Sequence, residues 1–253
     1  MEFSTLAKGI EILNLFLKER APLTAIQIAS ALQMPRSTTF KYLAVLKEHG
    51  LLENEQLSGK YKLGFRLLEF SSLIQSQNPL LDAALPYMRK LSNLTEETVF
   101  LSTLSNGKPH CLEIVEYKRG IVFSLRRGDQ LPMNGGASTK VLVAFLSDKE
   151  IEDYTNRTEF VRYAKNTIIE AKKFRESLRE ISKAGFAYTD EEVTPGARGI
   201  AAPIFSEGGR PIAGLCLVGP VQRMQDKKIR EVRKMVVSFA REISAELNKW
   251  RRD

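Results

Sequence analysis

The chain has 253 residues, of which 43% are hydrophobic and 27% are charged, and it is long enough for two folded domains. No apolar run approaches the length of a membrane span and the N-terminus lacks a secretory pattern, so we expect a soluble cytoplasmic protein. Cys111 and Cys216 lie far apart without a CxxC spacing, which argues against a disulfide framework or a structural zinc site. We expect both thiols to be buried.

The net charge of +8 favours a polyanionic partner. Residues 1–78 carry nine Lys and Arg and seven Asp and Glu, a net charge of +2, which leaves +6 for residues 79–253. The total charge therefore does not identify the N-terminal part as a nucleic-acid binder. The positions of the charged residues are needed to identify the part that binds nucleic acid.

Apolar residues recur every three or four positions at the start of the chain. They are Leu6, Ile10, Leu13 and Leu17. This spacing predicts an amphipathic helix over residues 4–18. After a break at Pro22, Thr24 and Gln27 have the spacing of a capping box, which predicts a short second helix through Leu32.

A third helix is predicted between Pro35, which suits a first helical turn, and Gly50, which suits a C-terminal stop. At 100° per residue its core side contains Thr39, Tyr42, Leu43 and Leu46. The opposite side collects Ser37, Lys41, Ala44 and Glu48, with Thr38 and Phe40 at its flanks and Arg36 at its N-terminal end. Small hydroxyls and cations leave room for close approach to phosphates and base edges, as a DNA recognition helix requires. The alternative is that the hydroxyls only cap the helix.

The stretch "LLENEQLSGKYKL" contains two short extended runs around Ser58, which predict a basic hairpin. A helix-turn-helix followed by such a hairpin is a winged helix, whose second paired helix enters the major groove. The residues assigned to DNA binding are Arg36, Ser37, Thr38, Thr39, Lys41, Tyr42, Lys60 and Lys62. We expect Arg36 and Lys41 to contact phosphate or guanine edges, the hydroxyls to position the helix, and the two hairpin lysines to anchor the wing.

A connector helix is predicted over residues 65–76, and a second helix runs from the break at Pro79 to about Asn93. We place the domain boundary at this break, with a winged helix-turn-helix and linker helix over residues 1–77 and an effector-binding domain over residues 78–253. Both helices are dense in apolar residues, which suggests a partner subunit as well as a core. A two-fold dimer would read two DNA half-sites.

The rest of the chain alternates strands and helices. Strands are predicted at "TVFLSTL" and "HCLEIVE" around an Asn106-Gly107 turn, and at "IVFSL", "FAYTD", "GIAAPIF" and "PIAGLCLVG". Helices are predicted at residues 137–146, after capping boxes at Ser147 with Glu150 and at Thr167 with Glu170, and at residues 226–250. The expected fold class is α+β, with helices on a mostly antiparallel sheet.

We expect no enzyme activity, no cofactor and no metal. The chain has two histidines and lacks the GxSxG, HExxH, P-loop and dinucleotide patterns of common catalytic sites. It has glycine-rich loops instead, "LPMNGGASTK" and "DEEVTPGARGIAA". Glycines allow backbone N–H groups to approach a ligand, and the helix starting at Ala137 would attract a small carboxylate. The alternative is that these glycines only permit tight turns.

Along nearly its whole length the chain resembles the IclR family of bacterial transcriptional regulators. The stretches that carry the resemblance are "STLAKGIEILNLF", "LTAIQIASALQMPRSTTFKYLAVLKEHGLL", "GKYKLG", "ALPYMRKLSNLTEETVFL", "GDQLPMNGGASTK", "GFAYTDEEVTPGARGIAAPIF" and "GLCLVGPVQR". Their order and spacing together are highly specific. The resemblance implies an N-terminal winged helix-turn-helix, a GAF-like C-terminal effector domain, dimers or dimers of dimers, and a response to small organic acids.

By position, the resemblance implies an effector pocket. Its residues would be Phe123, Leu125, Leu131, Ala137, Ser138, Thr189, Asp190, Ala197, Gly199, Cys216 and Val218. The chain departs from the usual family pattern before this helix, with Asn134 and a Gly135-Gly136 pair, and at Gly199. These departures leave the identity of the effector open.

The sequence therefore predicts a sequence-specific DNA-binding regulator, expected to be a repressor, whose operator affinity depends on a small organic acid. Two other functions remain as alternatives. One is a sequence-tolerant DNA-packing protein, against which the modest charge of residues 1–78 argues mildly. The other is a small-molecule enzyme with a DNA anchor.

Overall fold

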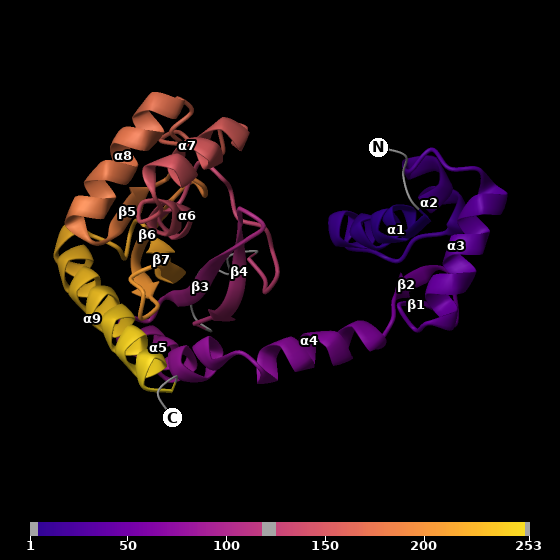
Figure 1. Ribbon diagram of the computed structural model, residues 1–253, viewed down its shortest axis with the longest axis horizontal. Helices are drawn as coiled ribbons and strands as arrows, with labels where there is room; N and C mark the ends of the chain where they lie inside the picture. The colour runs from indigo at the N-terminus through magenta and orange to yellow at the C-terminus, as the bar shows by residue number, and fades with distance from the viewer. Residues whose placement is uncertain (1–4, 118–124, 251–253) are drawn as a thin grey trace. The chain divides into compact units, whose positions relative to one another are not determined.

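The computed structural model describes residues 5–117 and 125–250 of the chain (Figure 1). The chain divides into two compact units, Met1–Asn78 and Pro79–Asp253, and each is described by itself. Among the described residues, no helix is long and apolar enough to cross a membrane.

The N-terminal unit contains four helices and a two-stranded hairpin within the described residues. Its elements are α1 (Thr5–Glu19), α2 (Ala25–Ala31), α3 (Arg36–Glu48), β1 (Leu52–Asn54), β2 (Tyr61–Leu63) and α4 (Arg66–Ser76). The predicted capping box opens α2, because Thr24 Oγ1 accepts from Gln27 N at 3.2 Å and Gln27 Oε1 accepts from Thr24 N at 2.8 Å. The core between α1, α2, α3 and β1 includes Ile12, Phe16, Ile28, Leu43 and Leu52.

The end of α3 is joined tightly to the hairpin. Gly50 adopts a φ of +68°, and the N–H groups of Gly50 and Leu51 donate to the carbonyls of Lys47 and Leu46, a double closure typical of a glycine-terminated helix. Gly64, just after β2, donates its N–H to Leu51 O at 2.9 Å. A side chain at Gly64 has no room, because its Cβ would lie 2.0 Å from the Gly50 carbonyl oxygen.

Helix α4 contains no buried residue, although much of it is apolar. Its exposed large hydrophobic side chains, together with that of the preceding residue, are those of Phe65, Leu68, Phe70, Leu73 and Ile74. A helix with this composition is expected to be covered by another surface in the working protein.

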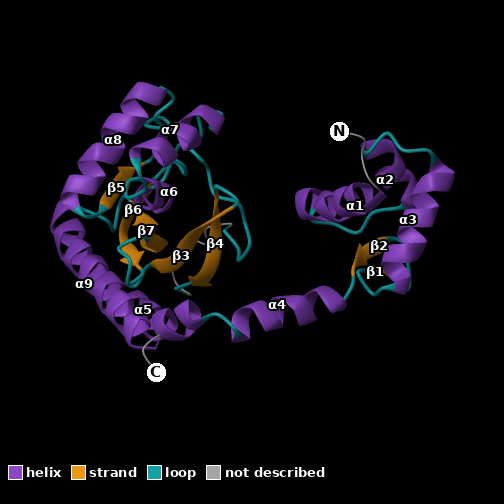
Figure 2. Ribbon diagram, in the orientation of Figure 1, coloured by secondary structure: helices purple, strands orange, loops and turns teal. Residues whose placement is uncertain are grey.

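The C-terminal unit is an antiparallel sheet between two helical layers (Figure 2). The described strands are β3 (Thr98–Ser105), β4 (Lys108–Val115), β5 (Ala187–Asp190), β6 (Ala197–Phe205) and β7 (Pro211–Pro220), in the order β4-β3-β7-β6-β5. One face packs against α5 (Pro79–Thr95) and α9 (Asp226–Trp250). The other face packs against α6 (Ala137–Val143), α7 (Asp148–Arg157) and α8 (Ala171–Ala184). The predicted α+β class is confirmed.

The tight turn and the two capping boxes predicted for this unit have different outcomes. Asn106 and Gly107 both have positive φ and form the predicted tight turn between β3 and β4. Ser147 caps α7 together with Glu150, as predicted. Thr167 does not cap α8, because its hydroxyl donates to the carbonyl of Glu192 at 2.6 Å, and α8 starts only at Ala171. Residues 121–124 of the predicted strand "IVFSL" lie outside the described residues.

Candidate DNA-binding face and effector site

The exposed side of α3 begins with a cation and a hydroxyl. Arg36, Ser37 and Lys41 are exposed and Thr38 is half-buried. No side chain caps the N-terminus of α3, where Pro35 takes the cap position, so the first-turn hydroxyls of Ser37 and Thr38 are not used as caps. This arrangement differs from the alternative in which they serve only as helix caps.

Two of the residues assigned to DNA binding face the core instead. Thr39 is fully buried and its hydroxyl donates to Pro35 O at 3.1 Å, so it fixes the first turn of α3 and does not reach a partner. Tyr42 is half-buried and packs against the core of the N-terminal unit. Both positions agree with the core side predicted from the helical period, and their direct contact with DNA is not supported.

A mostly apolar hollow of about 650 Å³ lies between α1 and α3. Thr38, Lys41 and Tyr42 contribute to its lining, together with Leu6 and Ile10 of α1. The side chain of Leu6 on α1 is 74% exposed. It adds apolar surface next to the polar side of α3.

The hairpin places its two lysines differently. Lys62 lies opposite Glu53 in the β1–β2 register, with 3.7 Å between Nζ and Oε2, and its ammonium is 5.7 Å from the ring centroid of Phe65. Lys60 follows the turn, where its N–H donates to Ser58 Oγ at 3.2 Å, and its carbonyl accepts from Glu55 N. Within the described residues the Lys60 ammonium has no ion-pair partner, so it is the wing cation available to a phosphate.

In the C-terminal unit, the predicted effector residues gather on the sheet face that α6 covers. They are Ala137 and Ser138 on α6, Thr189 on β5, Ala197 and Gly199 on β6, and Cys216 and Val218 on β7. A Cβ at Gly199 would lie 3.1 Å from Thr189 Oγ1 and 3.6 Å from Ala137 Cβ, so helix and strands approach closely there. Leu131 is buried and Leu125 half-buried against the same cluster, whereas Phe123 lies outside the described residues.

Asp190 does not join this group. Successive residues of a strand point to opposite faces, and Asp190 follows Thr189. Its carboxylate Oδ2 instead accepts from Arg198 Nη2 at 3.0 Å, and this hydrogen bond raises the pKa of the Arg198 guanidinium. The predicted role of Asp190 in effector binding is therefore corrected to a structural one at the ends of β5 and β6.

Sequence reasoning missed a buried ion pair beside the predicted effector residues. Lys140 Nζ on α6 lies 2.6 Å from Glu192 Oε1, and the two side chains are only 3% and 10% exposed. The second carboxylate oxygen of Glu192 accepts from Gly136 N at 3.3 Å. Lys140 lies one turn after Ala137, so the sequence could have indicated a cation near the predicted effector residues. It could not indicate the partner of Lys140, which lies 52 residues away.

Comparisons with known proteins agree with this architecture. The family description "Bacterial transcriptional regulator IclR C-terminal" matches residues 73–245, and "IclR helix-turn-helix domain" matches residues 5–56. The chain belongs to the IclR family of bacterial transcriptional regulators. It is 26% identical to the transcriptional repressor IclR of Escherichia coli, covering 96% of this chain and 89% of that protein. It is 28% identical to the transcriptional regulator KdgR of the same organism, with 96% and 92% covered.

Solved structures of the IclR family share the fold. The IclR of Thermotoga maritima superposes with a TM-score of 0.78 at 28% identity, covering 98% of this chain and all of that one. An IclR homolog from Microbacterium hydrocarbonoxydans, crystallised with 4-hydroxybenzoate, superposes with a TM-score of 0.86 at 25% identity, covering 97% of this chain and all of that one.

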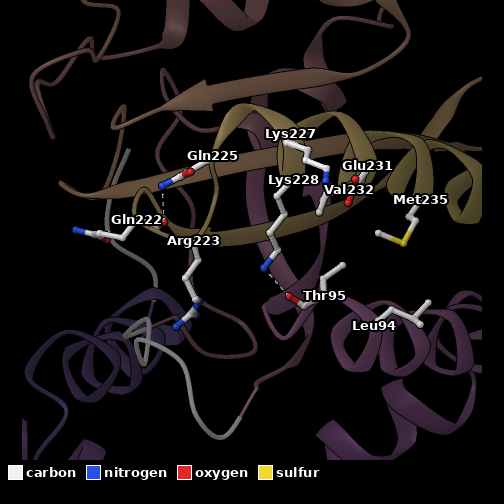
Figure 3. A pocket seen from close by; sticks show the side chains of 10 residues that line it. All are labelled: Leu94, Thr95, Gln222, Arg223, Gln225, Lys227, Lys228, Glu231, Val232 and Met235. Atoms are coloured by element: carbon white, nitrogen blue, oxygen red, sulfur yellow. Dashed lines mark hydrogen bonds between the residues drawn. The ribbon is translucent and has the colours of Figure 1, made fainter.

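The chain also has a hollow of about 470 Å³ between the end of α5 and the start of α9, lined by both polar and apolar side chains (Figure 3). Next to it, the buried carboxylate of Glu97 accepts from Arg223 Nη2 at 2.6 Å and from Lys228 Nζ at 3.0 Å. Lys228 Nζ also donates to Thr95 O at 2.8 Å. The two cations therefore fasten the β7–α9 turn and the first turn of α9 to the residue before β3, through a carboxylate that both of them share.

Neither cysteine of the IclR-family chain is placed for redox or nucleophilic chemistry. Cys111 and Cys216 are both buried, as expected, and burial raises the pKa of each thiol, that of Cys111 to about 12. A thiol in this state is not a nucleophile at neutral pH. Among the described residues, no group of three or more His, Cys, Asp or Glu side chains could hold a metal ion.

Proposed function

We propose that this chain is a dimeric repressor that binds operator DNA through α3 and the β1–β2 hairpin and is controlled by a small organic acid bound beside α6. The observation that carries the proposal is the division of α3 into two sides. Leu43 and Leu46 are buried in the core, and Arg36, Ser37 and Lys41 are exposed at the N-terminal end, where recognition helices contact base edges.

The exposed apolar side of α4 supports the dimer. Leu68, Leu73 and Ile74 are each about three-fifths exposed, which is costly for a helix that stays in water. A second copy of the chain that covers α4 would also place two recognition helices on one DNA, and a two-fold site gives the selectivity that one winged helix lacks.

The cluster beside α6 supports the effector site. Gly199, Thr189 and Ala137 approach one another closely there, and the Ser138 hydroxyl lies at the start of the same helix, 3.7 Å from the position of a Cβ at Gly136. The 4-hydroxybenzoate bound to the Microbacterium homolog is an organic acid, which supports this class of ligand. Binding there would change operator affinity by about 5- to 150-fold, the usual range of allosteric coupling.

Binding to the chain's own upstream intergenic DNA, titrated against random DNA at physiological salt, tests the proposal. We expect selective binding that changes when one member of a panel of small organic acids is added. Specific binders prefer their site by about 10³- to 10⁷-fold. Equal affinity for both DNAs, unaffected by any acid, would instead indicate a DNA-packing protein, and turnover of a small molecule would indicate an enzyme.

Lys60→Ala is expected to weaken binding to all DNA sequences alike. Its ammonium lies on the wing without an ion-pair partner in the described part of the chain, as a pure phosphate contact requires. The plot of log affinity against log salt should lose about one unit of slope per subunit. Lys62→Ala is the matched control, because Lys62 is already paired with Glu53 and should change the slope less. A change in base preference with Lys60→Ala would contradict the wing assignment.

Ser138→Leu is expected to abolish the response to the organic acid and to leave operator binding intact. Ser138 is 5% exposed and its hydroxyl lies 3.7 Å from the position of a Cβ at Gly136, so a larger side chain at this position crowds the start of α6, where the acid is proposed to bind. The measurement is operator affinity with and without the acid, alongside the melting temperature of the protein. Loss of both DNA binding and ligand response would show a folding defect and not a blocked site.

A further inference from the structure

The buried pair of Lys140 and Glu192 closes the loop of residues 191–196 over the start of α6. Glu192 binds α6 twice, through Lys140 Nζ at 2.6 Å and through the N–H of Gly136 at 3.3 Å. A Cβ at Gly135 would lie 3.1 Å from Val193 Cγ2, and one at Gly136 would lie 3.3 Å from it. The loop therefore rests directly on the backbone that leads into Ala137 and Ser138.

The charge of this region is balanced without any ligand. Among the residues that the structure describes, Lys140 is the only lysine or arginine that is buried, and Glu192 already neutralises it. A second carboxylate beside Ala137 would have to share one ammonium with Glu192, and two buried carboxylates at one cation repel each other. A small anion can be neutralised here only if Glu192 leaves.

The same segment holds a buried acceptor that lacks a donor. Asn134 is fully buried and its Nδ2 donates to the carbonyls of Val161 and Ile168, but its Oδ1 has no hydrogen-bond partner among the described residues. An unpaired buried acceptor costs free energy until a donor reaches it. This cost lies two residues before Gly136, in the segment that the 191–196 loop covers.

We propose that Glu192 is an internal competitor for small carboxylates, and that an organic acid binds this protein by displacing Glu192 from Lys140. The inference rests on the proposed effector site beside α6 and assigns its anion-binding residue. Lys140 is then the counter-ion of the ligand, and binding releases the 191–196 loop that leads into β6. A neutral molecule of the same shape has no charge with which to replace Glu192.

The test measures binding of four probes to the full-length chain by calorimetry: benzoate with its neutral analogue benzamide, and acetate with acetamide. Glu192→Gln leaves Lys140 buried without a counter-ion, a condition that a bound anion relieves. We expect benzoate or acetate to bind Glu192→Gln at least about tenfold more tightly than the wild-type chain. The amides should bind both proteins equally.

Two control variants isolate the pair. Glu191→Gln removes a carboxylate of the same loop that pairs with the 66% exposed Lys165 and accepts from Gly196 N at 2.8 Å. Because Glu191 does not pair with Lys140, this variant should not reproduce the gain in carboxylate affinity. Lys140→Met combined with Glu192→Gln removes both buried charges and should abolish the gain. The proposal is overturned if Glu192→Gln binds neither acid more tightly than wild type, or if the double variant binds them equally well.

If Glu192→Gln does not fold, amide hydrogen exchange of the wild-type chain tests the proposal instead. Displacement of Glu192 should speed exchange at Gly136 as benzoate is added, because the Gly136 N–H loses its hydrogen bond to Glu192. Unchanged exchange up to the solubility limit of benzoate overturns the proposal. These binding measurements are made without DNA. A failure of selective operator binding would therefore count against the proposed function but would not change the result on carboxylate binding.

Discussion

Gly64→Ala is expected to destabilise the N-terminal unit by about 3 kcal/mol or more and to abolish operator binding. Its Cβ would lie 2.0 Å from the carbonyl oxygen of Gly50 and 2.8 Å from the carbonyl carbon. These are backbone atoms, so they cannot rotate away as the end of a flexible side chain can. Relief requires separating α3 from the hairpin, which breaks the bond from Gly64 N to Leu51 O.

Gly9→Ala is the matched control for this prediction. Gly9 lies in the interior of α1, has ordinary helical backbone angles, and nothing lies within 4 Å of the position its Cβ would take. The same substitution should therefore stabilise the unit by about 0.5 to 1 kcal/mol. Urea denaturation followed by circular dichroism measures both variants. Equal stability of the two would show that the Gly50–Gly64 approach is not as close as described.

Local sequence signals predicted much of this fold because they depend on residues close in the chain. The capping boxes at Thr24 and Ser147 each use a hydroxyl and a side chain three residues away, so nothing distant is needed to form them. Gly50 ends α3 by a positive φ that few other residues adopt. The two sides of α3 followed from the helical period alone.

The errors come from partners distant in sequence. Thr167 has the spacing of a capping box, but its hydroxyl bonds to the carbonyl of Glu192, 25 residues later. Asp190 was placed in the effector site, yet the cross-strand register brings Arg198 opposite it. Lys140 stands in a stretch that sequence reasoning singled out, but only the fold shows the carboxylate that neutralises it. A single sequence does not contain these pairings.

Replacing Arg36 and Lys41 together with alanine is expected to weaken operator binding by about 3 kcal/mol, or roughly 150-fold. Both side chains are exposed on the first two turns of α3, where a recognition helix contacts phosphates and guanine edges. Neither contributes to the core, so the folded state should keep its stability and only the contact with DNA should be lost.

Lys47→Ala distinguishes this contact from a general effect of charge. Lys47 is also exposed on α3, but in its last turn, at the opposite end of the helix from Arg36. Its loss should weaken binding much less than the double variant does. Single substitutions of Arg36 and Lys41, each measured on operator and on random DNA, show which kind of contact each residue makes. A residue that reads a base loses selectivity for the operator, whereas a phosphate contact loses affinity for both DNAs equally. If Lys47→Ala weakened binding as much as the double variant, the N-terminal end of α3 would not be the recognition surface, because the effect would depend on net charge and not on position.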